Sequence, residues 1–352
     1  MRGYVIINKI LKTAFFLGTL AIFFQNGDII TNSVKTGLEL CYSAVIPSLF
    51  IFMVLSAVLS QSVGAKIVAL PLWPYAKLLK AKDAGKTAGY IFLALLGGFS
   101  AGSMMLGKIK QSCKDSNRLS VLAIAMVNNS PSFCIMTVGF ILLGNKNIGV
   151  LLFVSLTLAS LIVAFVFSFI LKYEYISFSP DEKSDRTSFV DCVKNAVTAM
   201  TFICGFVVFF NCLCSVILKY VNFPFSILPI ALSEVTYACK YCAENAEGNI
   251  YLICFLLSIL PISTLCQVYG FVGDKTVIKN LILSRFIHTP VSLTIFSLLL
   301  HVFPNYSAAS ATDIISVRKY RVNAEASLIL FLIAVLFIII FDKNKLFTKF
   351  SN

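Results

Sequence analysis

Long apolar runs separated by short charged segments dominate the chain. Most of these runs exceed the roughly 20 residues that a helix needs to cross a bilayer. The uncharged windows are 40–65, 87–107, 119–145, 147–171, 195–218, 248–273 and 286–312, with shorter ones at 13–24 and 326–341. The pattern predicts an all-α polytopic membrane protein with about eight to ten membrane segments.

Composition supports this class. The 352 residues are 58% hydrophobic and 13% charged, which leaves too little polar surface to cover a soluble domain of this size. The net charge of +13 comes from basic residues in short loops between the apolar windows. We therefore assign it to cytoplasmic loops that follow the positive-inside bias, and we expect no nucleic-acid partner.

Eleven cysteines are scattered through the chain. They show neither the paired arrangement of a disulfide framework nor the spacing of a four-ligand zinc site. We expect no bound metal and no cofactor.

One hydrophilic stretch divides the apolar chain into comparable halves. This stretch, residues 172–194, is predicted to be a polar linker. It separates a first transmembrane repeat at 40–171 from a second at 195–303. An N-terminal membrane anchor helix with its loop at 1–39 precedes the repeats, and a loop with a C-terminal membrane helix and basic tail at 304–352 follows them.

The window 87–107 has glycines at its centre, namely Gly97, Gly98 and Gly102. Basic residues flank it on both sides, at Lys77, Lys80, Lys82 and Lys86 and at Lys108, Lys110, Lys114 and Arg118. Both ends should therefore lie on the cytoplasmic side, so the segment cannot cross. We expect a re-entrant hairpin whose arms reach roughly 15 Å, with its tip near the midplane.

The second half repeats the order of these features. The window 248–273 is interrupted at Pro261, and we expect it to form a second hairpin. A helix broken at Pro131 in the first half is matched by a helix broken at Pro290 in the second. If the second hairpin enters from the outside, the halves form an inverted repeat like those of secondary transporters.

Asn128, Asn129 and Ser130 precede Pro131 inside an apolar window. Such groups need partners in hydrocarbon, and an unwound turn also frees backbone groups to bind an ion or solute. The alternative is that the two amides satisfy the broken helix or join two helices.

Glu234 is the single acidic residue between Asp191 and Glu244. An intramembrane carboxylate indicates a functional site, although a position at the membrane interface is the alternative. The predicted midplane site for substrate or ion consists of Ser100, Asn128, Asn129, Ser130, Glu234, Thr236 and Gln267.

The segment from Gly98 to Gly102 also fits the G-x-S-x-G pattern of a serine nucleophile, and Ser100, Glu234 and His288 follow the chain order of a hydrolase triad. That nucleophile needs a strand before it and a helix after it, and no alternating strand pattern is present. We predict that the chain is not an enzyme and keep an intramembrane serine hydrolase as a further hypothesis.

The order of several motifs between Ile46 and His301 resembles one family. The motifs are Pro47-Ser48-Leu49-Phe50, Gly98-Phe99-Ser100-Ala101-Gly102-Ser103-Met104, Asn129-Ser130-Pro131-Ser132-Phe133 with Gly139, and Leu232-Ser233-Glu234-Val235-Thr236. They resemble the Gate, or nucleoside-recognition, domain membrane proteins and are most similar to the YlbJ-type sporulation integral membrane proteins. Ser100 stands where that family has proline, and Met104 replaces its lysine.

The resemblance implies a transporter-like protein that moves or senses a small polar solute, with a role in sporulation. We expect alternating access by rocking of one repeat against the other, with a coupling cation at Glu234. It implies a multi-pass protein of the bacterial cytoplasmic (inner) membrane, in the forespore or the mother cell, whose partners are the lipid bilayer and sporulation membrane proteins. The alternative function is a non-transporting membrane component of spore envelope assembly that acts through protein partners.

Overall fold

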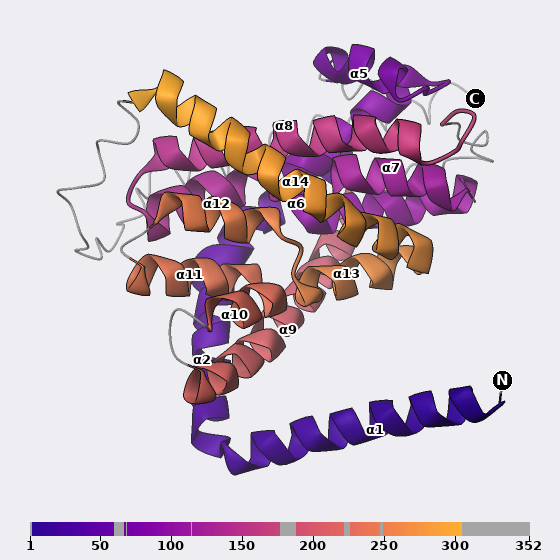
Figure 1. Ribbon diagram of the computed structural model, residues 1–352. Helices are drawn as coiled ribbons and strands as arrows, with labels where there is room; N and C mark the ends of the chain where they lie inside the picture. The colour runs from indigo at the N-terminus through magenta and orange to yellow at the C-terminus, as the bar shows by residue number, and fades with distance from the viewer. Residues whose placement is uncertain are drawn as a thin grey trace, which may run out of the picture. The chain divides into compact units, whose positions relative to one another are not determined.

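The computed structural model describes residues 2–59, 67, 69–113, 115–176, 188–221, 226–246 and 249–304, which all belong to one structural unit, residues 1–311 (Figure 1). Over these ranges the chain is helical, with an isolated bridge between Ala81 and Ile176 and no strand. The all-α prediction is confirmed for this part of the chain. The predicted C-terminal helix and the centre of the predicted linker, 177–187, lie outside the described residues.

The helices follow one another with short connections. In chain order they are α1 (Arg2–Gln25), α2 (Gly27–Leu40), the π-helix η1 (Cys41–Val45), α3 (Ile46–Leu59), the 3-10 turn η2 (Leu70–Leu72), α5 (Trp73–Leu78), α6 (Ala84–Ser112), α7 (Ser116–Met126), the π-helix η3 (Phe133–Leu142), α8 (Lys146–Ile170), α9 (Phe189–Tyr220), α10 (Ile227–Ser233), α11 (Val235–Asn245), α12 (Ile250–Ser258), α13 (Ile262–Val272) and α14 (Lys275–Val302).

Polar side chains set many of the helix starts. Their oxygens accept hydrogen bonds from the backbone N–H groups of the first turn, which have no partner inside the helix. These caps are Asp83 for α6, Asp115 for α7, Asn145 for α8, Ser188 for α9, Asn249 for α12 and Asp274 for α14.

Among the described residues, five segments are long and apolar enough to cross a membrane: Ala84–Gln111, Lys146–Ile170, Phe189–Tyr220, Ile250–Val272 and Lys275–Val302. Large apolar side chains also cover the outside of the described helices, as at Phe24, Tyr42 and Phe286. An apolar exterior of this extent indicates contact with lipid. The chain is therefore a multi-pass membrane protein.

The long helix α6 is interrupted at Gly98, whose φ of +73° and ψ of −164° are not helical. A Cβ placed on Gly102 would lie 3.6 Å from the Cβ of Ala94, although residues eight apart in a straight helix are roughly 12 Å apart along its axis. The two halves of α6 therefore lie against each other. Gly97 and Gly102 are themselves helical and supply space for close packing.

The ends of α6 meet at one aromatic ring. The Nζ of Lys82 lies 3.6 Å from the ring centroid of Tyr175, and the guanidinium carbon of Arg118 lies 5.2 Å from the same centroid. A straight helix of 29 residues would separate its ends by roughly 43 Å. The chain thus leaves and returns to the same end of the structure.

The segment 248–273 differs from its prediction. The chain is interrupted at 259–261 near Pro261, as expected, but α12 and α13 do not pack against each other. In Figure 1 they extend from their connection in different directions. The two helices instead follow one another along α14, so the predicted second hairpin at this position is wrong. The proline cannot continue α12 because it lacks an N–H group, and it begins α13 instead.

Pro290 does not break its helix. It lies inside α14, which continues from Lys275 to Val302. The packing of α14 along α7, α8 and α12 holds the helix on both sides of the proline, and such tertiary contacts allow proline within membrane helices. The predicted break at Pro290 is therefore wrong, whereas at Pro131 the chain is irregular over 127–130 and a new helical turn begins at the proline.

Buried apolar side chains concentrate around α7. Every residue from Leu119 to Met126 is buried, because α6, α8 and α14 pack around this helix. A second apolar cluster joins η3, α8, α11, α12 and the end of α14. Chain breaks next to these two clusters lie inside the protein rather than at its surface.

Candidate functional site

Four interruptions of the helices lie inside the protein. They occur at Gly98 in α6, at 127–130 between α7 and η3, at Glu234 between α10 and α11, and at 259–261 between α12 and α13. Buried backbone groups need hydrogen-bond partners, so irregular backbone at this depth must be capped by side chains or face a cavity.

Side chains cap two of the helices that begin at these breaks. The hydroxyl of Ser130 accepts the N–H of Phe133 at 3.1 Å. A carboxylate oxygen of Glu234 accepts the N–H of Tyr237 at 2.7 Å. Glu234 is only 4% exposed, and its carboxyl group lies at the N-terminus of α11, where the helix dipole favours the ionised form.

Residues at three of the breaks, together with the first turns of α13 after the fourth, border one cavity of about 50 Å³. This volume holds only a few water molecules, so the cavity in this form is smaller than a usual small-molecule site. Its polar lining is Ser100, Ser130, Glu234, Thr236, Ser263, Thr264 and Gln267, and its other lining residues are Val45, Leu49, Gly97, Gly98, Phe99, Phe133, Ile203, Val207 and Val235. The wall therefore combines apolar and aromatic surface with a group of convergent polar side chains.

Five of the seven predicted site residues line this cavity: Ser100, Ser130, Glu234, Thr236 and Gln267. They come from three breaks and from α13, which are far apart in the sequence. The hydroxyl of Ser100 donates to Oε1 of Gln267 at 3.4 Å, which links α6 to α13 directly. Among the described lining residues, Glu234 alone carries a charge.

Asn128 and Asn129 are buried but do not line the cavity. Nδ2 of Asn128 donates to the carbonyl of Ala125 and, at 2.6 Å, to the hydroxyl of Ser160. Nδ2 of Asn129 donates to the carbonyl of Leu257 at 2.9 Å. The amides thus satisfy the broken helix and join it to its neighbours, which is the structural alternative that the sequence left open.

A polar face on α14 was missed by sequence reasoning. Arg285 is 9% exposed, and its Nη2 donates to the carbonyl of Val127 at 3.1 Å. Val127 is the C-cap of α7, so the guanidinium lies at the negative end of that helix dipole. The signal was present in the sequence, since polar residues recur every fourth position at Asn280, Ser284, His288 and Ser292.

His288 lies on the same face and is 1% exposed. Its Nδ1 is 3.2 Å from the carbonyl oxygen of Ser258, and its Nε2 is 3.1 Å from that of Leu156. A neutral imidazole carries a single N–H, so it donates to one of these carbonyls at a time. The ring joins α14 to the end of α12 and to α8.

These contacts keep Ser100 and His288 apart. The hydroxyl of Ser100 is engaged with Gln267, whereas both ring nitrogens of His288 face backbone carbonyls. The triad suggested by chain order is therefore not assembled by these hydrogen bonds. Within the described ranges, no group of three or more His, Cys, Asp or Glu side chains is arranged to hold a metal ion.

Polar contacts also join the two halves of the chain away from the cavity. Nζ of Lys110 donates to the carbonyl of Val272 at 2.6 Å, and the hydroxyl of Ser116 donates to Asp274 at 2.7 Å. These contacts connect the ends of α6 and α13 and the starts of α7 and α14.

Asp274 is the N-cap of α14. Partial burial acts to raise the pKa of this carboxyl, but hydrogen bonds from Ser116 and from the N–H groups of Thr276 and Val277, together with the charge of Lys110, outweigh it. The pKa of Asp274 therefore lies below its usual value, because its ionised form receives these donors.

Comparisons of the chain with protein families, curated proteins and solved structures found no match.

Proposed function

We propose that this protein binds a small polar solute in the cavity between the helix breaks and moves it across the membrane. The observation that carries the proposal is the convergence of three breaks and the start of α13, from both halves of the chain, on a cavity lined by the buried carboxyl group of Glu234. Secondary transporters place their sites where discontinuous helices meet, because unwound backbone there can bind solute and ions.

The order of breaks suggests how the halves correspond. The first half has a folded-back helix (α6), a broken helix (α7 with η3) and a continuous helix (α8). The second has α10 packed on α11, then α12 with α13, then α14. We propose that these triplets are an inverted repeat and that α6 and the α10–α11 pair are its re-entrant hairpins. The second hairpin tip is then Glu234 rather than Pro261.

The cavity wall suggests the chemistry of the solute. Hydroxyl and amide groups from α6, α11 and α13 offer donors and acceptors, while Phe99 and Phe133 supply aromatic surface. The chemistry of this wall suits a neutral, ring-containing polar solute, in line with the nucleoside class that the motif resemblance implies, and binding such a solute requires the cavity of about 50 Å³ to widen. Glu234 has no cationic partner among the lining residues, so we assign it to a coupling cation.

Transport into proteoliposomes tests the proposal. The purified full chain is reconstituted and assayed with a panel of radiolabelled nucleosides and nucleobases, with and without sodium and proton gradients. The test variant is Glu234→Gln, which keeps the shape of the side chain and removes its charge. The matched control is Glu244→Gln on the same helix, because the side chain of Glu244 is 59% exposed and lies outside the cavity.

We expect gradient-driven uptake that Glu234→Gln abolishes and Glu244→Gln leaves intact. Uptake that survives Glu234→Gln would remove the carboxylate from the mechanism. A different result would favour the non-transporting role in spore envelope assembly. In that case no member of the panel is taken up, deletion of the whole protein impairs sporulation, and Glu234→Gln leaves sporulation intact.

A further inference from the structure

A surface outside the cavity gathers basic and aromatic side chains from segments that are distant in sequence. We define the basic–aromatic patch by seven residues: Trp73 and Lys77 of α5, Lys80 and Lys82 of the loop that follows, Arg118 of α7, and Tyr173 and Tyr175 after α8.

Cations in the patch lie over aromatic rings. Nζ of Lys77 is 3.7 Å from the ring centroid of Trp73. Lys82 and Arg118 share the ring of Tyr175, at 3.6 and 5.2 Å from its centroid. The ring of Tyr175 therefore holds two cationic side chains from segments that are distant in the sequence within one small surface.

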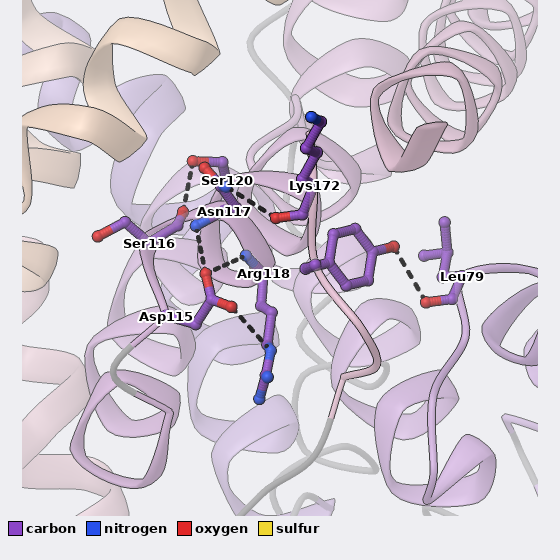
Figure 2. Close-up of polar contacts among 8 residues, drawn as sticks. Leu79, Asp115, Ser116, Asn117, Arg118, Ser120 and Lys172 are labelled. Atoms are coloured by element: carbon purple, nitrogen blue, oxygen red, sulfur yellow. Dashed lines mark hydrogen bonds and ion pairs between the residues drawn. The ribbon is translucent and has the colours of Figure 1, made fainter. Parts of the chain in front are cut away.

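Backbone contacts fix the segments that carry these side chains. The hydroxyl of Tyr173 donates to the carbonyl of Leu79 at 3.1 Å, and Nδ2 of Asn117 donates to the carbonyl of Lys172 at 2.9 Å (Figure 2). The patch is therefore a fixed feature of the fold and not a chance grouping of long side chains.

Carboxylates offset only part of the positive charge, although Asp83 and Glu174 are chain neighbours of patch residues. Arg118 forms an ion pair with Asp115 at 3.0 Å. For Lys77, Lys80 and Lys82, the described part of the chain provides aromatic contacts but no carboxylate within 4.0 Å. The patch thus has an excess of positive charge.

Apolar side chains are exposed next to these cations. The helix α5 has six residues, about 9 Å of helix, and is too short to cross a bilayer. Ala76 on its inner side is fully buried, whereas Leu70, Trp73 and Leu78 are 63%, 43% and 58% exposed. Tryptophan and apolar side chains beside lysines are typical of a segment that lies in the membrane interface.

We propose that the basic–aromatic patch binds the phosphate headgroups of anionic phospholipids, with Leu70, Trp73 and Leu78 in contact with the acyl chains. Charge complementarity selects anionic over zwitterionic lipid. The exposed apolar residues favour a bilayer over a soluble acidic partner, because a soluble partner would leave them in water. This inference does not depend on transport.

The chain has a single tryptophan, Trp73, so its fluorescence reports on this surface alone. The full chain is reconstituted in phosphatidylcholine vesicles that contain an equal fraction of either dibrominated phosphatidylglycerol or dibrominated phosphatidylcholine. Bromine quenches the tryptophan at short range, and the ratio of the two quenching curves gives the relative affinity of the patch for the anionic lipid.

We expect the anionic lipid to be preferred by about fivefold for each lysine that contacts its headgroup. The substitutions Lys77→Gln, Lys80→Gln and Lys82→Gln together should bring the ratio close to one, and salt should lower it in the wild type. The same change at three exposed lysines elsewhere, Lys35, Lys146 and Lys194, is the matched control and should preserve it.

Three results would overturn the proposal: an equal effect of both lipids on the wild type, an unchanged ratio in the patch variant, or no quenching by either lipid. The last would mean that Trp73 does not contact the bilayer. If the triple variant does not fold, the single Lys82→Gln variant and the salt dependence of the wild type decide the question.

Discussion

The substitution Gly98→Ala tests the break in α6 most directly. Gly98 has a φ of +73° and a ψ of −164°, a combination that is essentially restricted to glycine. A Cβ at this position would also lie 2.9 Å from the Cβ of Ser130 and 3.0 Å from its backbone nitrogen. The methyl group therefore strains the backbone of α6 and collides with the break between α7 and η3.

Both effects are destabilising and can be given magnitudes. Backbone strain in such a region costs about 1–3 kcal/mol. Overpacking against a neighbour that cannot move freely costs about 1–3 kcal/mol more. At about 2 °C per kcal/mol for a chain of this size, we expect the melting temperature of Gly98→Ala to fall by roughly 4–12 °C.

The assay is thermal unfolding in detergent, followed by circular dichroism. The matched control is Gly205→Ala in the middle of α9, because a Cβ on Gly205 meets nothing within 4 Å. Alanine is favoured over glycine inside a helix by about 0.5–1 kcal/mol, so the control should melt at or slightly above the wild-type temperature. If Gly98→Ala melted with the control, the chain would not be broken at Gly98 and the contact between the halves of α6 would be refuted.

Three further variants probe other parts of the structure. Gly102→Ala should lower the melting temperature without backbone strain, because its Cβ would lie within 2.4 Å of the Met126 carbonyl oxygen; wild-type stability would exclude this close approach. Asp274→Asn removes a carboxyl group whose pKa is lowered in the folded state. The wild type should therefore be more stable than the variant above about pH 5 and should lose this advantage as the pH falls below about 4. A difference in melting temperature that does not change with pH would contradict this prediction. His288→Phe removes the N–H that one of the two carbonyls, on α8 or α12, accepts, and should cost about 1–3 kcal/mol. His288→Gln, which keeps an N–H, should cost less; equal losses in denaturant unfolding would argue against hydrogen bonding as the cause.

Features that depend on local sequence were the most predictable. Apolar windows between charges identified the long helices, because bilayer thickness sets a minimum length for a crossing segment. The glycines around Gly98 indicated a break, and lysines on both sides of the window indicated that its ends lie together, as the shared ring of Tyr175 now shows.

Whether a proline interrupts its helix was less predictable, and the predicted match between the two halves failed for this reason. Pro290 looks like Pro131 in the sequence, yet α14 continues through Pro290 while the chain is irregular before Pro131. The difference comes from tertiary packing, because α14 lies along three other helices. Local sequence cannot reveal whether neighbouring helices will hold a proline-containing helix together.

The break at Glu234 shows the same limit. Glu234 was predicted as a site residue, but the helix break on which it lies was not predicted, since no glycine or proline marks it. The chain becomes extended there, with φ −154° and ψ 126°, because the Glu234 side chain caps the helix that follows. Glutamate is not among the residues that commonly occupy an N-cap, so no start signal for α11 is present in the sequence at Glu234.

The buried charges follow the polarity of the broken helices. Arg285 lies at the C-terminus of α7, and Glu234 lies at the N-terminus of α11. The guanidinium group lies at the negative end of one helix dipole and the carboxyl group at the positive end of another. The dipoles therefore offset part of the free-energy cost of burying these ionisable groups. Arg285 lies away from the cavity, while Glu234 lines it. The carboxyl group that a solute or cation would meet is therefore held in place by the same break that borders the cavity. Glu234→Gln keeps an oxygen that can cap α11, so this substitution should affect binding more than folding.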